Sequence, residues 1–153
     1  MTTIMEVANF FLQKTNHETE TVISPLKLQK VCYYAQAWCL ALNGVRLFDD
    51  EFVAWPHGPV NEDLYHKYKD YKWRPIDFPE DFDDSVLSLQ ERNYLNDVWE
   101  LYGKYDAKYL EDLTHQELPW QEAREGYPEG HHCSVVIREE TMRNYYRELL
   151  ADG

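Results

Sequence analysis

The sequence SPLKLQKVCYYAQAWCLALNG, residues 24–44, decides the fold. Ser24 is a favourable helix N-cap, and Pro25 suits the first helical position, where the N–H that proline lacks would have no partner inside the helix. At the other end, Asn43 and Gly44 are residue types that readily adopt the left-handed conformation in which many helices end. We therefore predict one continuous helix with a defined boundary at each end of this stretch.

The middle of the predicted helix is apolar on nearly every side. From Val31 to Leu42, Gln36 is the only residue whose side chain is neither aliphatic, aromatic nor cysteine. A helix of this kind must be buried on several faces or lie in a membrane. The apolar run is shorter than the roughly 20 residues that span a bilayer. We expect it to form the central helix of a soluble core, with Cys32 and Cys39 packed there as free thiols.

The rest of the chain predicts a mainly α-helical single domain over residues 1–153, with about six helices around a buried central helix and a small antiparallel β element. Two short apolar runs flank Asp49-Asp50, which predicts a hairpin of Val45–Phe48 against Glu51–Trp55. The β-branched segment Ser134–Ile137 is expected to add a strand to that sheet. Hydrophobic spacing and capping residues indicate further helices at Thr3–Lys14, Val60–Tyr71, Ser88–Tyr102, Asp106–Thr114 and Glu139–Leu150, with a short helical turn from Pro119.

Charge is distributed unevenly along the chain, whose formal net charge is −13. Residues 1–76 carry a net charge of −1, and residues 77–153 carry −12. An acidic half of this kind repels phosphate backbones and attracts basic proteins, so we expect no direct nucleic-acid partner. The odd count of three cysteines argues against a disulfide scaffold, and the N-terminal segment has no export signal. We therefore expect a cytoplasmic protein with no membrane association.

The histidines leave a metal-dependent hydrolase as one interpretation, in which His131, His132 or Cys133 would act together with His115. Zinc sites space their ligands roughly two to four residues apart so that several can converge on one ion, and adjacent loop residues do not match that pattern. The sequence also has no nucleophile elbow, P-loop or dinucleotide fingerprint. We therefore expect no catalytic residue, no metal ion and no cofactor.

Two further stretches combine turn residues with tryptophan. AWPHGPV, residues 54–60, is typical of a hairpin exit that prolines pin and an indole ring packs. LTHQELPW, residues 113–120, is typical of a junction between two helices, in which Thr114 or His115 bonds the last carbonyls of one helix and Pro119 begins the next. The THxExPW pattern leaves a catalytic interpretation open, although the chemistry of a helix junction accounts for each residue type.

Together these stretches resemble the SocA-like, or Panacea, antitoxin domain family, also described as phage-associated GepA-like proteins. That family combines a KLQKL-YYAQ-W-LA-G helix with an AW–GPV turn and an LTHxExPW segment, and the resemblance covers about residues 23–148. The chain departs from the pattern at Val31-Cys32, where the family more often has two leucines. The matching positions, called the signature residues below, are Lys27, Leu28, Gln29, Lys30, Tyr33, Tyr34, Gln36, Trp38, Trp55, Gly58, Pro59, Thr114, His115, Glu117, Pro119 and Trp120.

The resemblance implies a non-enzymatic antitoxin that binds and neutralises a cognate protein toxin, which is usually encoded by the adjacent gene. Two alternatives share the same fold. One is an adaptor that delivers a toxin to a cytoplasmic protease, and the other is a phage-encoded interaction protein that acts on a host factor. In each of them the protein acts by binding another protein.

We place the candidate partner surface at the polar start of the central helix and on the elements around it. The apolar middle of that helix is expected to hold the fold together, which leaves its polar residues and the neighbouring turns to meet a partner. The residues that we expect on this surface are Lys27, Gln29, Lys30, Trp55, His57 and His115.

Overall fold

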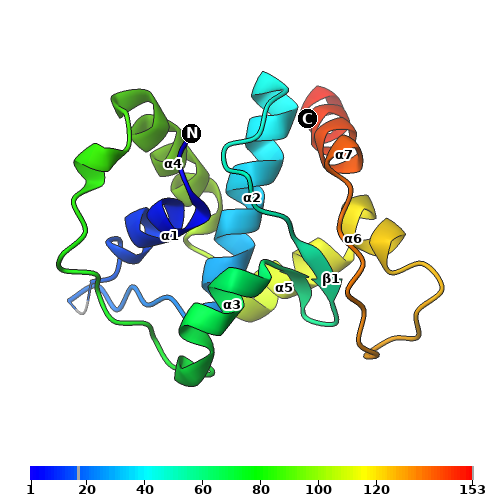
Figure 1. Cartoon of the computed structure of the whole chain (residues 1–153), viewed down its shortest axis with the longest axis horizontal. Coiled ribbons are helices and arrows are strands. Elements are labelled where there is room, and N and C mark those ends of the chain that lie inside the picture. The colour runs from blue at the N-terminus through cyan, green and yellow to red at the C-terminus, as the bar shows by residue number, and fades with distance from the viewer. Residues whose placement is uncertain (17, 153) are drawn as a thin grey trace.

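The central helix predicted from the sequence is present and lies in the middle of the molecule (Figure 1). The computed structural model describes residues 1–16 and 18–152. In it, helix α2 runs over Pro25–Asn43, and the Ser24 side chain accepts a hydrogen bond from the backbone N–H of Lys27. Gly44 ends the helix with a φ of +73°, a left-handed conformation that glycine adopts without steric cost. The helix boundaries predicted from the sequence are therefore confirmed.

Six more α-helices in the described part of the chain confirm a mainly helical fold. The capping boxes at Thr3 and Ser88 are both formed, and the Asp106 side chain caps the helix that follows it. Two short 3-10 turns lie at Lys69–Tyr71 and Asp84–Val86. The other helices are α1 (Ile4–Leu12), α3 (Glu62–Tyr68), α4 (Leu89–Tyr102), α5 (Ala107–His115), α6 (Leu118–Ala123) and α7 (Glu139–Asp152).

Helix α2 is the element that most of the other helices pack against. Helices α1 and α4 lie on one side of it and α7 lies on the other, while α3 and α5 lie near its start (Figure 1). Its aromatic residues Tyr33 and Tyr34 are fully buried, and they pack against Phe52 and against Tyr146 of α7. Each such side chain contributes roughly 1.5–3 kcal/mol of burial free energy, so this cluster is a main source of stability.

The small sheet is not where the sequence placed it. Strand β1 (Val53–Trp55) pairs antiparallel with β2 (Gly58–Val60), so the prediction of Val45–Phe48 against Glu51–Trp55 is wrong. The segment before the sheet is instead bound by the Gln36 side chain. Its Nε2 donates to the Phe48 carbonyl at 2.7 Å, and its Oε1 accepts the Leu47 N–H at 2.8 Å. Because α2 already satisfies these backbone groups, the segment has no need of a strand partner.

The segment Ser134–Ile137 adds a single bridge rather than a full strand. Val136 pairs with Val53, and the backbone N–H of Ala54 donates to the Val135 carbonyl at 3.0 Å. The bridge brings the loop before α7 against β1. Among the described residues, no helix is long and apolar enough to cross a membrane.

Candidate functional site

The hairpin turn and the start of α2 meet at Gly58, which has a φ of +108°. A Cβ atom on this residue would lie 2.7 Å from Cε of Lys30 and 2.8 Å from Oγ1 of Thr114. Both the backbone conformation and the close approach therefore require glycine here. The arrangement lets the fully buried Lys30 ammonium donate to the Pro59 carbonyl at 2.9 Å. Burial lowers the pKa of Lys30 to about 7, and the charge of Glu111 opposes that shift.

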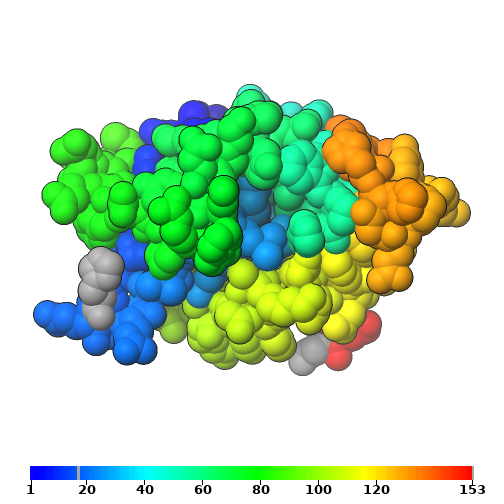
Figure 2. All heavy atoms as spheres, turned by 90° about the horizontal axis from the view of Figure 1, so that it is seen from below, coloured from blue at the N-terminus to red at the C-terminus, as the bar shows by residue number. Residues whose placement is uncertain are grey.

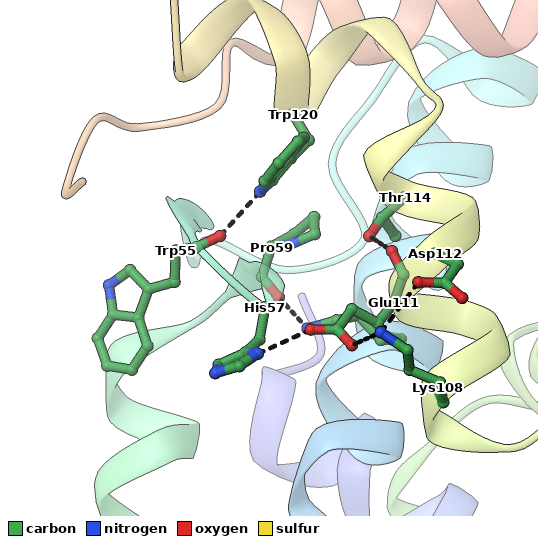
Figure 3. A network of polar contacts seen from close by, with 9 residues as sticks. Trp55, His57, Pro59, Lys108, Glu111, Asp112, Thr114 and Trp120 are labelled. Atoms are coloured by element: carbon green, nitrogen blue, oxygen red, sulfur yellow. Dashed lines mark hydrogen bonds and ion pairs between the residues drawn. The ribbon is translucent and has the colours of Figure 1, made fainter. Parts of the chain in front are cut away.

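The same hairpin is bound from its other side by the α5–α6 junction (Figure 3). The indole N–H of Trp120 donates to the Trp55 carbonyl at 2.8 Å, and the guanidinium of Arg124 donates to the Ala54 carbonyl at 2.8 Å. The His115 ring stacks on Trp120 with ring centroids 4.0 Å apart. The AWPHGPV and LTHQELPW stretches, which lie more than fifty residues apart in the sequence, are therefore one structural unit.

Glu111 links this unit to solvent through a cluster of ion pairs (Figure 3). Its carboxylate lies 2.7 Å from Nδ1 of the exposed His57 and 3.2 Å from Nζ of Lys108, which also pairs with Asp112 at 3.2 Å. Burial raises the pKa of Glu111, but the hydrogen bonds from His57 and Lys108 outweigh burial, so the pKa is lowered overall. Glu111 is thus a buried carboxylate that stays charged through surface partners.

A second buried carboxylate, Glu117, holds α2 and α7 together. Its Oε1 accepts hydrogen bonds from the hydroxyls of Tyr34 at 2.7 Å and Tyr146 at 2.8 Å. The Tyr33 hydroxyl lies 3.2 Å from that of Tyr146 and extends the network. Burial raises the pKa of Glu117 to about 7, although both hydrogen bonds act to lower it. Near neutral pH this carboxyl therefore titrates inside the core.

The polar residues at the start of α2 are buried, which corrects the predicted partner surface. Lys27 donates to the Gly103 carbonyl at 2.6 Å, and Gln29 both donates to and accepts from the backbone of Asn61 at 2.9 Å. Together with Lys30, these side chains bind backbone groups far away in the sequence, so they cannot lie exposed as we expected. Buried polar groups need such partners because an unpaired one costs about 1–3 kcal/mol.

The other signature residues also serve the fold. Leu28 and Pro119 are buried, and the half-buried Trp38 donates its indole N–H to the Tyr102 hydroxyl at 2.7 Å. Thr114 donates its hydroxyl to the Glu111 carbonyl at 2.8 Å. Of the six residues expected on the partner surface, only His57 is exposed, whereas Trp55 and His115 are half-buried.

Sequence reasoning did not single out Lys108, Glu111 or Arg124 for this site. The spacing of Lys108 and Glu111 by three positions on one helix was a usable signal for their ion pair. Arg124 gave no such signal, because its partners are backbone carbonyls of the hairpin and of the loop that follows α6. Only the three-dimensional structure brings these groups together.

The residues proposed for a hydrolase do not form a common site. Cys133 is buried with its thiol 3.7 Å from the Ala123 carbonyl, while His131 and His132 are exposed on the adjoining loop. Burial is the main cause that lowers the pKa of His115, whose ring is held against Trp120. Within residues 1–16 and 18–152, no three His, Cys, Asp or Glu side chains are placed to hold one metal ion.

The geometry shows three signature segments of the chain, at the start of α2, in the hairpin and at the α5–α6 junction, interlocked by buried contacts. Residues 28–121, which contain all the signature residues except Lys27, match the family model of the antitoxin SocA-like, Panacea domain. The chain belongs to this family. A comparison with curated proteins and a comparison with solved structures gave no match. In this Panacea domain the signature residues are therefore mainly those that hold the fold together.

Proposed function

We propose that this Panacea domain is an antitoxin that neutralises a cognate protein toxin by direct binding, without a catalytic step of its own. The match to the antitoxin family over residues 28–121 is the observation that carries the proposal. The signature lysines and Gln29 are bound to backbone carbonyls, and Glu117 is bound to the hydroxyls of Tyr34 and Tyr146. The buried roles of these side chains agree with the proposal, since groups fixed in the core are not free to act on a substrate.

Binding of the toxin would take place mainly on the accessible surface around the buried signature residues. A buried side chain contributes to the shape and rigidity of the surface above it, and a rigid surface reduces the conformational entropy that is lost on binding. The net charge of −13 adds a long-range attraction to a basic toxin and raises the rate of encounter.

The proposal is tested by producing the protein in bacteria together with the product of the adjacent gene. The adjacent product should stop growth when it is produced alone, and co-production of the Panacea domain should restore growth. The two proteins should also elute as one complex in size-exclusion chromatography. A neighbour that is harmless alone, or that stays toxic in the presence of the domain, contradicts the proposal. Recovery of a protease together with the toxin would favour the adaptor role instead.

A further inference from the structure

An apolar groove runs along α3 on the face of the molecule that carries the hairpin turn. It encloses about 240 Å³ and lies between the start of α2 and α3, with Leu28 and Leu64 in its lining and Trp55, Tyr65 and Tyr68 as aromatic residues. Figure 2 looks onto this face, where the blue start of α2 is visible at the bottom of a hollow beside green α3. The groove is smaller than the roughly 300–1,000 Å³ of typical small-molecule sites, so its size suits one anchoring side chain of a protein partner.

The aromatic residues of the groove are of the kind that dominate protein–protein binding. Trp55 and Tyr65 pack edge to face with ring centroids 4.8 Å apart, and Tyr65 remains 38% exposed. Tryptophan and tyrosine are enriched among the residues that contribute most to interface affinity, particularly where they line a preformed pocket. The groove therefore offers a rigid receptor for a bulky apolar side chain.

Five carboxylates line a second hollow directly beside this groove. Val60 lines the groove while its strand partner Val53 lines the acidic hollow, so one pair of strand residues separates the two. Glu62 also lies three residues from Tyr65 on α3, which places them on neighbouring positions of the helix surface. The carboxylates of the acidic hollow are those of Asp49, Asp50, Glu51, Glu62 and Asp63.

Most of this negative charge is uncompensated. Asp49 lies 3.5 Å from Arg46, whereas the other four carboxylates have no ion pair with any residue in the described part of the chain. Burial is the main cause that raises the pKa of Asp50; a hydrogen bond with the backbone of Ile4 opposes this shift, and the charges of Asp63 and Asp49 add to it. The groove lining also includes Lys72, which follows the 3-10 turn after α3, and His57 at the hairpin turn. The groove thus has an acidic border at the first turn of α3.

These observations identify the partner that fits. We propose that the groove along α3 binds a segment of the toxin that presents one bulky apolar side chain flanked by lysine or arginine residues. This inference rests on the proposed antitoxin function and adds to it the contact surface and the chemistry of the partner. A second copy of the chain fits less well, because a symmetric contact would bring two copies of the same acidic border together.

The chemistry is tested directly by NMR titration of the isotope-labelled full-length protein with three short synthetic peptides. One has a central phenylalanine flanked by lysines, one has the same phenylalanine flanked by glutamates, and one has a central serine flanked by lysines. We expect the first peptide to shift the backbone amides of residues 60–72 with a Kd about tenfold lower than those of the other two. Equal binding of the acidic peptide, or shifts confined to another face, would overturn the inference.

The location is tested with two charge-reversal variants of matched design. Glu62→Lys with Asp63→Lys alters the acidic border, whereas Asp97→Lys with Glu100→Lys makes the same change on an exposed part of α4. The first pair should raise the Kd of the basic peptide about tenfold and the second pair by less than about twofold. The variant Tyr65→Ala should weaken binding without any change of charge. Equal effects of both pairs, together with an unaffected Tyr65→Ala, would contradict the proposed location.

These outcomes are separable from those of the growth assay. If the unaltered domain neutralises the adjacent gene product but the groove variants neutralise it equally well, the groove inference fails and the antitoxin function stands. If the unaltered domain neutralises nothing while the basic peptide still binds along α3, the antitoxin function fails and the groove remains a binding site for basic, apolar segments.

Discussion

Gly58 combines two constraints at one residue, a left-handed backbone and a contact with the side chains of Lys30 and Thr114. Gly126 has a similar positive φ of +89°, but a Cβ there would meet nothing within 4 Å. Alanine at Gly126 would therefore show only the cost of the left-handed backbone, whereas alanine at Gly58 would show that cost and the cost of the steric clash together. Few positions in the chain offer so direct a control.

We expect Gly58→Ala to lower the free energy of unfolding by about 3 kcal/mol, of which roughly 1–2 kcal/mol comes from backbone strain and the rest from overpacking. Gly126→Ala should show the strain component alone. Urea denaturation of both variants measures the difference. Equal losses for the two variants would mean that Lys30 and Thr114 move aside without cost.

Glu117 makes stability depend on pH within the neutral range. Its pKa in the folded protein is raised to about 7 from an ordinary value of 4.5, so the folded state holds a proton that the unfolded state has released between these values. Stability contributed by this group is therefore present at low pH and is lost as the pH rises to about 7. Lys30 affects stability at higher pH. Its pKa is lowered from 10.5 to about 7, so its contribution to the free energy of unfolding rises with pH between these two values.

The variant Glu117→Gln should remove the part of the pH dependence of stability that comes from the Glu117 carboxyl. Relative to the variant, the unaltered protein should lose about 3 kcal/mol of unfolding free energy between pH values of about 4.5 and 7. Urea melts of both proteins across that range measure the difference. A difference that stays constant with pH would show that the Glu117 carboxyl has the same pKa in the folded and unfolded states.

At the scale of secondary-structure elements, the hydrogen bonds of Gln36 explain why the hairpin forms at β1 and β2 and not at Val45–Phe48. Gln36 is the only polar residue in the apolar middle of α2, and its amide binds both Leu47 and Phe48. Gln36→Leu should cost about 2–4 kcal/mol, because it leaves a buried backbone N–H and a buried carbonyl unpaired. Gln90→Leu, on the exposed surface of α4, should change stability by less than about 0.5 kcal/mol. Denaturation that does not distinguish the two variants would contradict this role.

Helices were predictable from the sequence because their signals are local. Ser24, Gly44 and the capping box of Ser88 with Glu91 each act within a few residues, and all are observed. The hairpin was misplaced because the amide that removes the need for a strand partner lies eleven residues upstream, where hydrophobic periodicity does not reveal it. For the same reason the sequence does not reveal that the polar start of α2 is buried. The partners of Lys27 and Gln29 are backbone groups of distant segments.

At the scale of the whole molecule, α2 contacts helices from both ends of the chain, which predicts a single cooperative unit. We expect urea unfolding followed by tryptophan fluorescence and by far-UV circular dichroism to give one transition with the same midpoint. Two separate transitions would show that α1 and α4 form a unit that unfolds independently of α2 and α7.

Most residues that hold the fold differ from those of the proposed partner surface, although Leu28, Gln29 and Trp55 belong to both. The signature residues are largely buried, whereas the groove along α3 and its acidic border are accessible. The most direct test is calorimetric titration of the adjacent gene product into two variants, Gln36→Leu and Tyr65→Ala, at a temperature at which both are folded. We expect Gln36→Leu to keep the Kd of the unaltered protein and Tyr65→Ala to raise it about tenfold. A raised Kd for folded Gln36→Leu, together with an unchanged Kd for Tyr65→Ala, would contradict the proposed binding surface.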